Sequence, residues 1–196
     1  MPAQERPERV TAAIGDTERT TIQGSQPPMA RPENDAGRMA VGTQLEGNSI
    51  VLSRTAAQEA DLQALIAAQQ DPTSPSYHKW LTPEEFAARF GVADAVIAKM
   101  QSWLEKHGFT VDSISRSKNR IIFSGTVEQV EAAFGTELHY YKVDGEAHFA
   151  PSRDISVPVA VSSLVQTVTN LSRPPVLIRL RQPTREIPSM HLRAAR

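Results

Sequence analysis

Apolar residues recur along this chain with two different periods. Between residues 56 and 107 they return every three or four positions, which predicts amphipathic helices. From residue 109 onward, short apolar runs alternate with polar residues and are separated by Gly, Asn, Asp and Ser, which predicts strands and turns. A short apolar run at Ile50 and Val51 predicts one more strand before the helices.

Start signals mark the predicted helices. In each of three places a threonine precedes a glutamine or glutamate by three residues, the pattern of a capping box: Thr55 with Gln58, Thr82 with Glu85, and Thr126 with Gln129. The apolar stripes behind these signals predict which side chains face inward: Leu62, Leu65 and Ile66, then Phe86 and Phe90, then Ile97, Met100 and Leu104, and finally Val127, Val130 and Phe134.

Strands are expected at residues 109–115 and 120–124, at 137–143, and at 165–171. Asp144-Gly145 is a strong hairpin signal between the third of these and a returning strand. The order strand, helices, strand, strand, helix, strand predicts an α+β fold, a ferredoxin-like antiparallel sheet packed against helices (split βαβ sandwich).

Composition divides the chain into three predicted segments. Residues 1–44 are polar and show no sustained period, so we expect a flexible N-terminal segment. Residues 45–172 hold the periodic pattern and form the predicted folded domain. Residues 173–196 are rich in Pro and Arg and are expected to form a basic tail or linker. The fold is therefore expected to carry disordered N- and C-terminal tails.

Several classes of chemistry are disfavoured by composition. The chain has no cysteine, so disulfides, thiolate catalysis and cysteine-based zinc sites are excluded. Its formal net charge of -1 gives no signal for nucleic acid. No apolar run is long enough to span a bilayer, and residues 1–10 lack the apolar core of a secretion signal. We expect neither a membrane nor a nucleic-acid partner.

Titratable residues do not assemble an evident active site. His139 and His148 flank the predicted hairpin turn, but the expected register pairs His139 with Ala150 and His148 with Tyr141, which separates the two imidazoles. The acidic pairs Glu84/Glu85 and Glu128/Glu131 stand at helix N-termini, where they offset the helix dipole. We therefore expect no catalytic residue, no metal site and no cofactor in this chain.

Two groups of residues are candidates for contact with a partner protein. His78 and Trp80 lie in the loop before the second helix, where they either pin the loop onto the helices or contact a partner. Arg173, Arg179 and Arg181 lie in the basic tail, which is either a solvated end or a linker along an acidic partner surface.

The segment DPTSPSYHKWLTPEEFAARFG, residues 71–91, resembles the signature of the activation domain of the sedolisin, or kumamolisin-like, serine-carboxyl peptidases. The likeness extends over residues 30–171, through ARPENDAGR at 30–38, the strand and helix at 45–80, the helix–hairpin–helix run at 103–151, and DISVPVAVSSLVQTVTNL at 154–171.

This resemblance implies a propeptide that assists folding of a secreted, acid-active peptidase, blocks its cleft and is removed at low pH. The implied partner is a sedolisin-type catalytic domain, in cis or in trans. The Ser-Glu-Asp catalytic domain is missing from the chain, so we expect no enzyme activity by itself.

The chain departs from the family pattern in having no evident secretion signal and in ending soon after the last predicted strand. We expect a truncated gene, a fragment or a stand-alone propeptide. The alternative is a stand-alone protein-interaction domain derived from such a propeptide.

Overall fold

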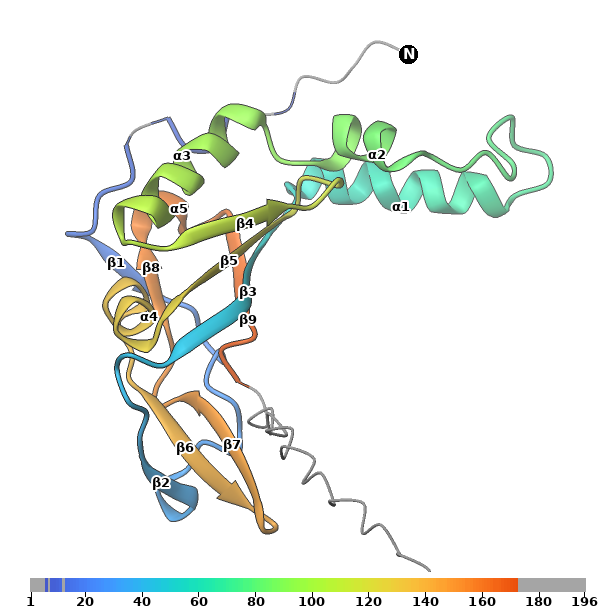
Figure 1. Ribbon diagram of the computed structural model, residues 1–196. Coiled ribbons are helices and arrows are strands. Elements are labelled where there is room, and N and C mark those ends of the chain that lie inside the picture. The colour runs from blue at the N-terminus through green and yellow to red at the C-terminus, as the bar shows by residue number, and fades with distance from the viewer. Residues whose placement is uncertain (1–5, 7, 12, 173–196) are drawn as a thin grey trace, which may run out of the picture.

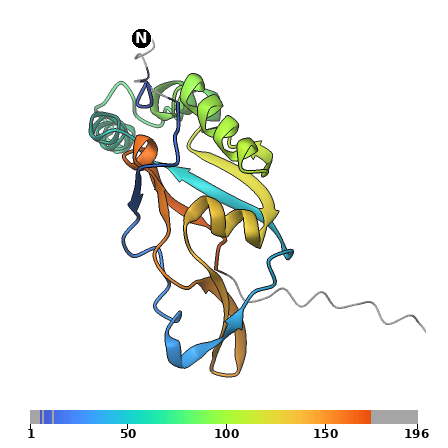
Figure 2. The same cartoon turned by 90° about the vertical axis from the view of Figure 1, so that its left-hand side faces the viewer.

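A four-stranded antiparallel sheet with helices on one face forms the body of the protein in the computed structural model (Figure 1, Figure 2). The structure describes residue 6, residues 8–11 and residues 13–172. The sheet has the order β4-β5-β3-β9, and each neighbouring pair is antiparallel. Its strands are β3 (Gln44–Leu52), β4 (Thr110–Ile114), β5 (Arg120–Thr126) and β9 (Val165–Thr169).

Five α-helices connect or cover these strands within the described residues. They are α1 (Ala56–Gln70), α2 (Pro83–Phe90), α3 (Asp94–Lys106), α4 (Val127–Phe134) and the short α5 (Val159–Ser162). The three predicted capping boxes are confirmed, with the threonine hydroxyl accepting from the N3 backbone and the N3 side chain accepting from the N-cap backbone. Gly135 ends α4 in the left-handed conformation that glycine adopts without strain.

Two smaller sheets flank the main one. A three-stranded sheet has the order β2-β6-β7, with strands β2 (Asp35–Arg38), β6 (Leu138–Val143) and β7 (Glu146–Pro151). It lies at the end of the molecule opposite α1 (Figure 1). A two-stranded ribbon pairs β1 (Arg19–Thr21) with β8 (Ser156–Pro158), and a single 3-10 turn, η1, spans Pro32–Asn34.

The α+β class and the packing of an antiparallel sheet against helices are confirmed. α1, α2 and α3 lie between β3 and β4, while α4 and α5 lie between β5 and β9. Each helical connection skips one strand of the sheet, because β5 lies between β3 and β4 and β3 lies between β5 and β9. The elements of the main sheet thus follow the order β-α-β-β-α-β, and the more specific ferredoxin-like assignment stays a prediction.

The hydrophobic core lies between the main sheet and the helices α3 and α4 (Figure 2). An aromatic group forms its centre, in which the ring of Phe123 from β5 lies 6.1 Å from that of Phe134 from α4 and 4.9 Å from that of Phe109. Trp103 of α3 packs edge-on against Phe134 at 5.9 Å. Burial of each such side chain contributes about 1.5–3 kcal/mol. The aromatic layer therefore stabilises the face of the sheet that α3 and α4 cover.

The prediction of a flexible segment before residue 45 is wrong for the residues that form strands there. β1 pairs with β8, and β2 pairs with β6 more than a hundred residues later in the chain. Val10 is buried, and Asp16 accepts a hydrogen bond from the indole N–H of Trp103 at 2.9 Å. These polar strands are specified by distant partners rather than by a local apolar pattern, which is why periodicity does not reveal them.

Candidate interaction surface

One face of the main sheet has no helices packed on it within the part of the chain that the structure describes. Directly paired residues of antiparallel strands lie on the same face, so the register decides which side chains face away from α3 and α4. Ile50 pairs with Ile121 and Val168, and all three belong to the core. The intervening positions therefore form the opposite face, which we call the open face and which includes Ser49, Val51, Arg120, Ile122, Thr167 and Thr169.

Most side chains of this open face are small, hydroxyl-bearing or β-branched, and Arg120, which pairs with Val51, is a long charged one among them. The hydroxyl groups of Ser49 and Thr169 are hydrogen-bonded to each other at 2.7 Å across β3 and β9. Ile122 and Val51 are half-buried. An antiparallel sheet commonly leaves one face to solvent. Here the exposed Arg120 lies beside these short side chains. A surface of this kind allows the backbone of a partner to come close.

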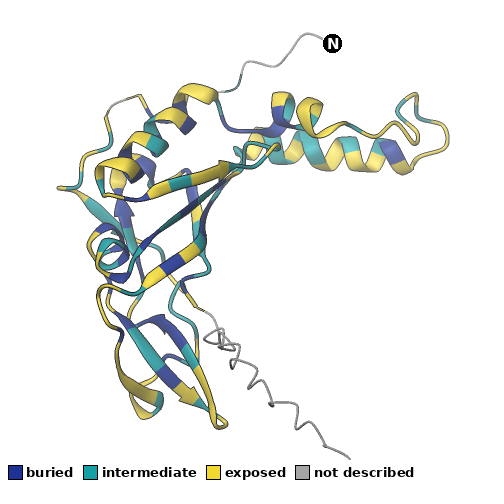
Figure 3. Ribbon diagram, in the orientation of Figure 1, coloured by how far each residue is buried: buried dark blue, intermediate teal, exposed yellow. Residues whose placement is uncertain are grey.

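The helices α1 and α2 form an arm, residues 56–90, that projects away from the body on the side opposite α4 (Figure 1). Most of its surface is exposed or half-buried (Figure 3). The prediction that α1 faces inward through Leu62, Leu65 and Ile66 is wrong for Ile66, which is 39% exposed, whereas Leu62 and Leu65 are half-buried and Gln69 is the one buried residue of this helix. Ile66 stays exposed because no third layer packs on the arm within the described residues.

Polar contacts hold the two helices of the arm together. The guanidinium of Arg89 on α2 forms a two-pronged ion pair with the carboxylate of Asp61 on α1, with one N–O distance of 2.6 Å. The bond from Arg89 lowers the pKa of Asp61 below its ordinary value. Within α2 itself, Phe86 and Phe90 form an aromatic contact, with ring centroids 5.1 Å apart.

The loop at the end of the arm presents aromatic side chains to solvent. The imidazole of His78 stacks on Tyr77 at 3.8 Å and lies 6.1 Å from the indole of Trp80. Trp80 is 69% exposed, the largest value among the exposed large apolar residues described. His78 and Trp80 therefore do not pin the loop onto the helices. Its backbone is held instead by Gln69, which donates to the carbonyl of Lys79 and accepts from the N–H of His78.

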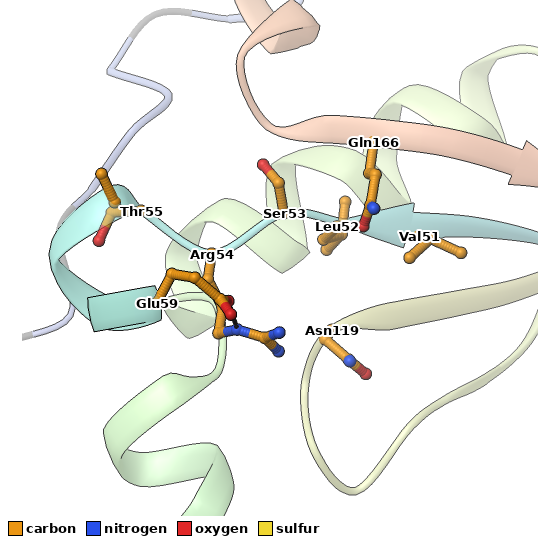
Figure 4. A pocket seen from close by; sticks show the side chains of 9 residues that line it. Val51, Leu52, Ser53, Arg54, Thr55, Glu59, Asn119 and Gln166 are labelled. Carbon is orange, nitrogen blue, oxygen red and sulfur yellow. Dashed lines mark hydrogen bonds and ion pairs between the residues drawn. The ribbon is translucent and has the colours of Figure 1, made fainter. Parts of the chain in front are cut away.

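A hollow of about 360 Å³ lies where the main sheet meets the base of the arm (Figure 4). Val51 of the open face, the ion pair between Arg54 and Glu59, and the side chains of Asn119 and Gln166 line it. The Nε of Arg54 lies 2.7 Å from the Glu59 carboxylate. The hollow continues the open face toward the arm. At this end the open face is recessed and lined by polar side chains.

The histidines lie apart, as the predicted register requires. His139 pairs with Ala150 and His148 with Tyr141 across β6 and β7. Among residue 6, residues 8–11 and residues 13–172, no group of three His, Cys, Asp or Glu side chains is arranged to hold a metal ion.

No helix in the described part of the chain has the length and apolarity that a membrane-spanning helix needs.

The candidate partner-contacting residues of the tail, Arg173, Arg179 and Arg181, lie outside the described residues. The structure brings His78 and Trp80 together at the end of the arm. Sequence reasoning missed Gln69 because a polar residue on a helix gives no burial signal. It also could not identify the members of the open face, since these follow from the pairing of strands far apart in sequence.

The geometry defines a small α+β domain with one uncovered sheet face and a projecting helical arm. The family model described as "Pro-kumamolisin, activation domain" matches residues 34–173, which is more than half of the chain. The chain belongs to this family of activation domains. The match begins just before β2 and continues past the end of β9, so it contains the main sheet, the arm and the three-stranded sheet.

Individual relatives agree with this assignment. The chain is similar to sedolisin of Pseudomonas sp. (strain 101), with 31% identity over 124 residues that make up 62% of this chain and 21% of that protein. It is also similar to kumamolisin of Bacillus sp. (strain MN-32), with 28% identity over 135 residues, 69% of this chain and 24% of the relative. Xanthomonalisin of Xanthomonas sp. (strain T-22) is 30% identical over 112 residues, 56% of this chain and 13% of the relative. The chain thus spans less than a quarter of the length of these curated relatives.

Proposed function

We propose that this chain is the propeptide of a sedolisin-type peptidase, which assists folding of the catalytic domain, blocks its cleft and dissociates in acid. The family match over residues 34–173 carries the proposal, because it covers the folded body from β2 to β9. On this account the chain cleaves no substrate by itself and acts where its peptidase acts, outside the cell. Incubating the pure chain with casein checks the first of these points.

Docking would take place through the open face. Its short side chains, such as those of the half-buried Thr167 and Thr169, allow a partner to pack closely against the sheet, and the half-buried Ile122 and Val51 supply apolar area. An ordinary stable interface buries about 1,600 Å² in total. The arm would form a second contact region, with His78 and Trp80 as the side chains that reach the peptidase. Exposed aromatic residues often dominate the binding energy of an interface.

The tail after β9 would block the cleft. Residues 173–196 would extend from the docked domain toward the active site, and Arg173, Arg179 and Arg181 would pair with carboxylates of the peptidase. In a fused precursor the tether would give an effective concentration on the order of millimolar. A separate chain depends on its own affinity and would inhibit less strongly.

Release in acid would follow from proton linkage. A peptidase carboxylate paired with an arginine of this chain has its pKa lowered in the complex. The pair stabilises the complex above the ordinary carboxyl pKa, and that stabilisation is lost as the pH falls through the lowered value. The complex is therefore expected to weaken as the medium becomes acidic.

Inhibition of a purified sedolisin-type peptidase by this chain tests the proposal. Measurements at about pH 6 and about pH 3.5 lie on either side of the ordinary carboxyl range. We expect inhibition at the higher pH and weaker inhibition at the lower one. Equal inhibition at both values would contradict acid release. No inhibition at either value would contradict docking, and would favour an interaction domain that binds an unrelated protein.

A further inference from the structure

Five ionisable side chains meet where β2, α4 and β6 come together: Asp35, Arg38, Glu131, Glu137 and His139. All four residues of β2 are exposed, so this strand has no apolar anchor of its own. Its pairing with β6 is interrupted by a register shift between Asp35 and Gly37. The buried Met39 follows β2 directly, and its N–H donates to the carbonyl of Leu138 at 2.8 Å. The attachment of the four β2 residues therefore depends on this flanking contact, on a short ladder and on these charges.

Each end of β2 is tied to β6 or α4 by a charged contact. At one end, the Asp35 carboxylate lies 2.8 Å from Nδ1 of His139, whose Nε2 lies 3.3 Å from the carboxylate of Glu137. At the other end, Arg38 lies 2.5 Å from Glu131 and 3.6 Å from Glu137. The cluster therefore connects three elements through alternating positive and negative groups.

Glu131 is the least exposed member of this cluster. Its side chain is 8% exposed, and Oε1 accepts a hydrogen bond from the backbone N–H of Leu138 at 2.8 Å and from Nε of Arg38 at 3.3 Å. One carboxylate thus joins α4, the first residue of β6 and the last residue of β2. A neutral acid at this position would lose the charge-assisted bond to Arg38.

Other groups around the cluster do not compensate for such a change. On the β7 side, the residue opposite His139 is Ala150. Tyr141 of β6 is neutral in acid, as any tyrosine is. Its burial and the charge of Asp35 raise its pKa further. Arg19 and Arg153 approach the end of α4 but donate to the backbone carbonyls of Ala133 and Gly135, and Glu128, one turn before Glu131, is exposed.

We propose that this cluster is an acid-sensitive latch, in which protonation of Asp35 and Glu131 frees β2 from β6 while the main sheet stays folded. The significance of the latch for a peptidase rests on the function proposed above. Freed residues 35–38 would be extended, cleavable chain, so acid would expose the domain to degradation once it leaves the peptidase.

The direction of the effect follows from linkage. The N–H of Gly37 and the bond and charge of His139 lower the pKa of Asp35. Burial raises the pKa of Glu131, but the bonds from Arg38 and from the N–H of Leu138 outweigh it, and the pKa is lowered. Both groups therefore stabilise the folded latch above ordinary carboxyl pKa values of about 4, and this stabilisation is lost as the pH falls through the lowered values.

The main sheet provides an internal reference. Its contact with the helices is made by apolar side chains such as Ile50, Ile121 and Phe123, which do not titrate. The latch and the main sheet should therefore respond differently to acid within the same molecule.

Hydrogen–deuterium exchange of the whole chain, without any peptidase, tests this proposal. Peptides covering 35–39 and 138–141 are compared with a peptide covering 120–126 at each pH between about 5.5 and about 3, which cancels the intrinsic pH dependence of exchange. We expect the protection of the latch peptides to fall about tenfold or more relative to β5 over this range. A protection ratio that stays constant would overturn the proposal.

Substitution separates the latch from general acid destabilisation. Glu131→Gln retains an acceptor for Leu138 but removes the charge, so the latch peptides should exchange rapidly at both ends of the pH range while β5 stays protected. Asp35→Asn should have the same effect if the first variant folds poorly. Arg116→Gln, which breaks an exposed pair with Glu84 on the other side of the molecule, is the matched control. A wild-type acid transition in either latch variant would contradict the proposal. Because no peptidase is present, these outcomes do not depend on the docking proposal.

Discussion

The side-chain amide of Gln69 donates a hydrogen bond to the backbone carbonyl of Lys79, across the loop at the end of the arm. The backbone carbonyl of Gln69 in turn accepts from the N–H of His78 at 3.1 Å. One buried residue of α1 thus holds the backbone of His78 and Lys79, directly before Trp80.

Replacing Gln69 with alanine should loosen this loop without unfolding the body. Loss of a buried hydrogen bond leaves the Lys79 carbonyl without its partner and costs about 1 kcal/mol locally. Hydrogen exchange of residues 72–81 should accelerate about fivefold, while that of β3 and β5 stays unchanged. Gln63→Ala removes an exposed amide from the same helix and is the control. Equal acceleration in both variants would mean that Gln69 has no special role.

Substitution of the exposed Trp80 should affect binding, whereas substitution of the buried Trp103 should affect stability. Trp80 is 69% exposed, so Trp80→Ala should change the free energy of unfolding by less than about 0.5 kcal/mol. The same change should weaken inhibition of a sedolisin-type peptidase by about thirtyfold, the effect of losing an aromatic residue worth about 2 kcal/mol at an interface. Trp103, 3% exposed in the core, should show the reverse order, with Trp103→Ala costing about 3–5 kcal/mol of stability.

Denaturant unfolding and an inhibition assay on both variants check this prediction. Trp80→Phe retains an aromatic ring and should keep part of the inhibition. Unchanged inhibition by Trp80→Ala would exclude the end of the arm from the interface.

Asp154 should contribute stability that depends on pH. Its carboxylate accepts hydrogen bonds from the N–H groups of Gln26 at 2.8 Å and Gly24 at 3.2 Å, and from the hydroxyl of Ser25. The bond from Gln26 is the largest of the causes that lower the pKa of Asp154. A lowered pKa means that the stabilisation is present above the ordinary value near 4 and disappears as the pH falls through the folded-state value.

Thermal unfolding of Asp154→Asn at about pH 6 and about pH 2.5 measures this contribution. The variant should melt at a lower temperature than the parent at the higher pH and nearly together with it at the lower pH. Asp144→Asn, which removes a carboxylate from the exposed hairpin turn, is the control variant. A pH-independent difference for Asp154→Asn would contradict the prediction.

Local signals predicted most regular elements of residues 45–171, with the short strand β8 as an exception. Thr55, Thr82 and Thr126 supply caps that act within one helical turn, and Asp144-Gly145 specifies its own hairpin. The strands β1 and β2 could not be predicted in this way, since their partners lie more than a hundred residues away. The exposure of Ile66 could not be predicted either, because an apolar stripe on a helix does not show whether another element packs against it.

Docking through the open face is the central claim, and a pair of charge insertions tests it most directly. Ile122→Arg places a long cation on the open face, whereas Ala98→Arg places one on the exposed side of α3, on the opposite side of the sheet. Both positions are at least partly exposed, so each variant is expected to fold, and circular dichroism confirms this before the assay.

The decisive measurement is the inhibition constant of each variant against a purified sedolisin-type peptidase at about pH 6, where interface carboxylates are charged. The account predicts that Ile122→Arg weakens inhibition by about a hundredfold or more, as expected for a charge buried in an interface, while Ala98→Arg inhibits like the parent chain. Full inhibition by folded Ile122→Arg, or an equal loss in both variants, would contradict docking through the open face.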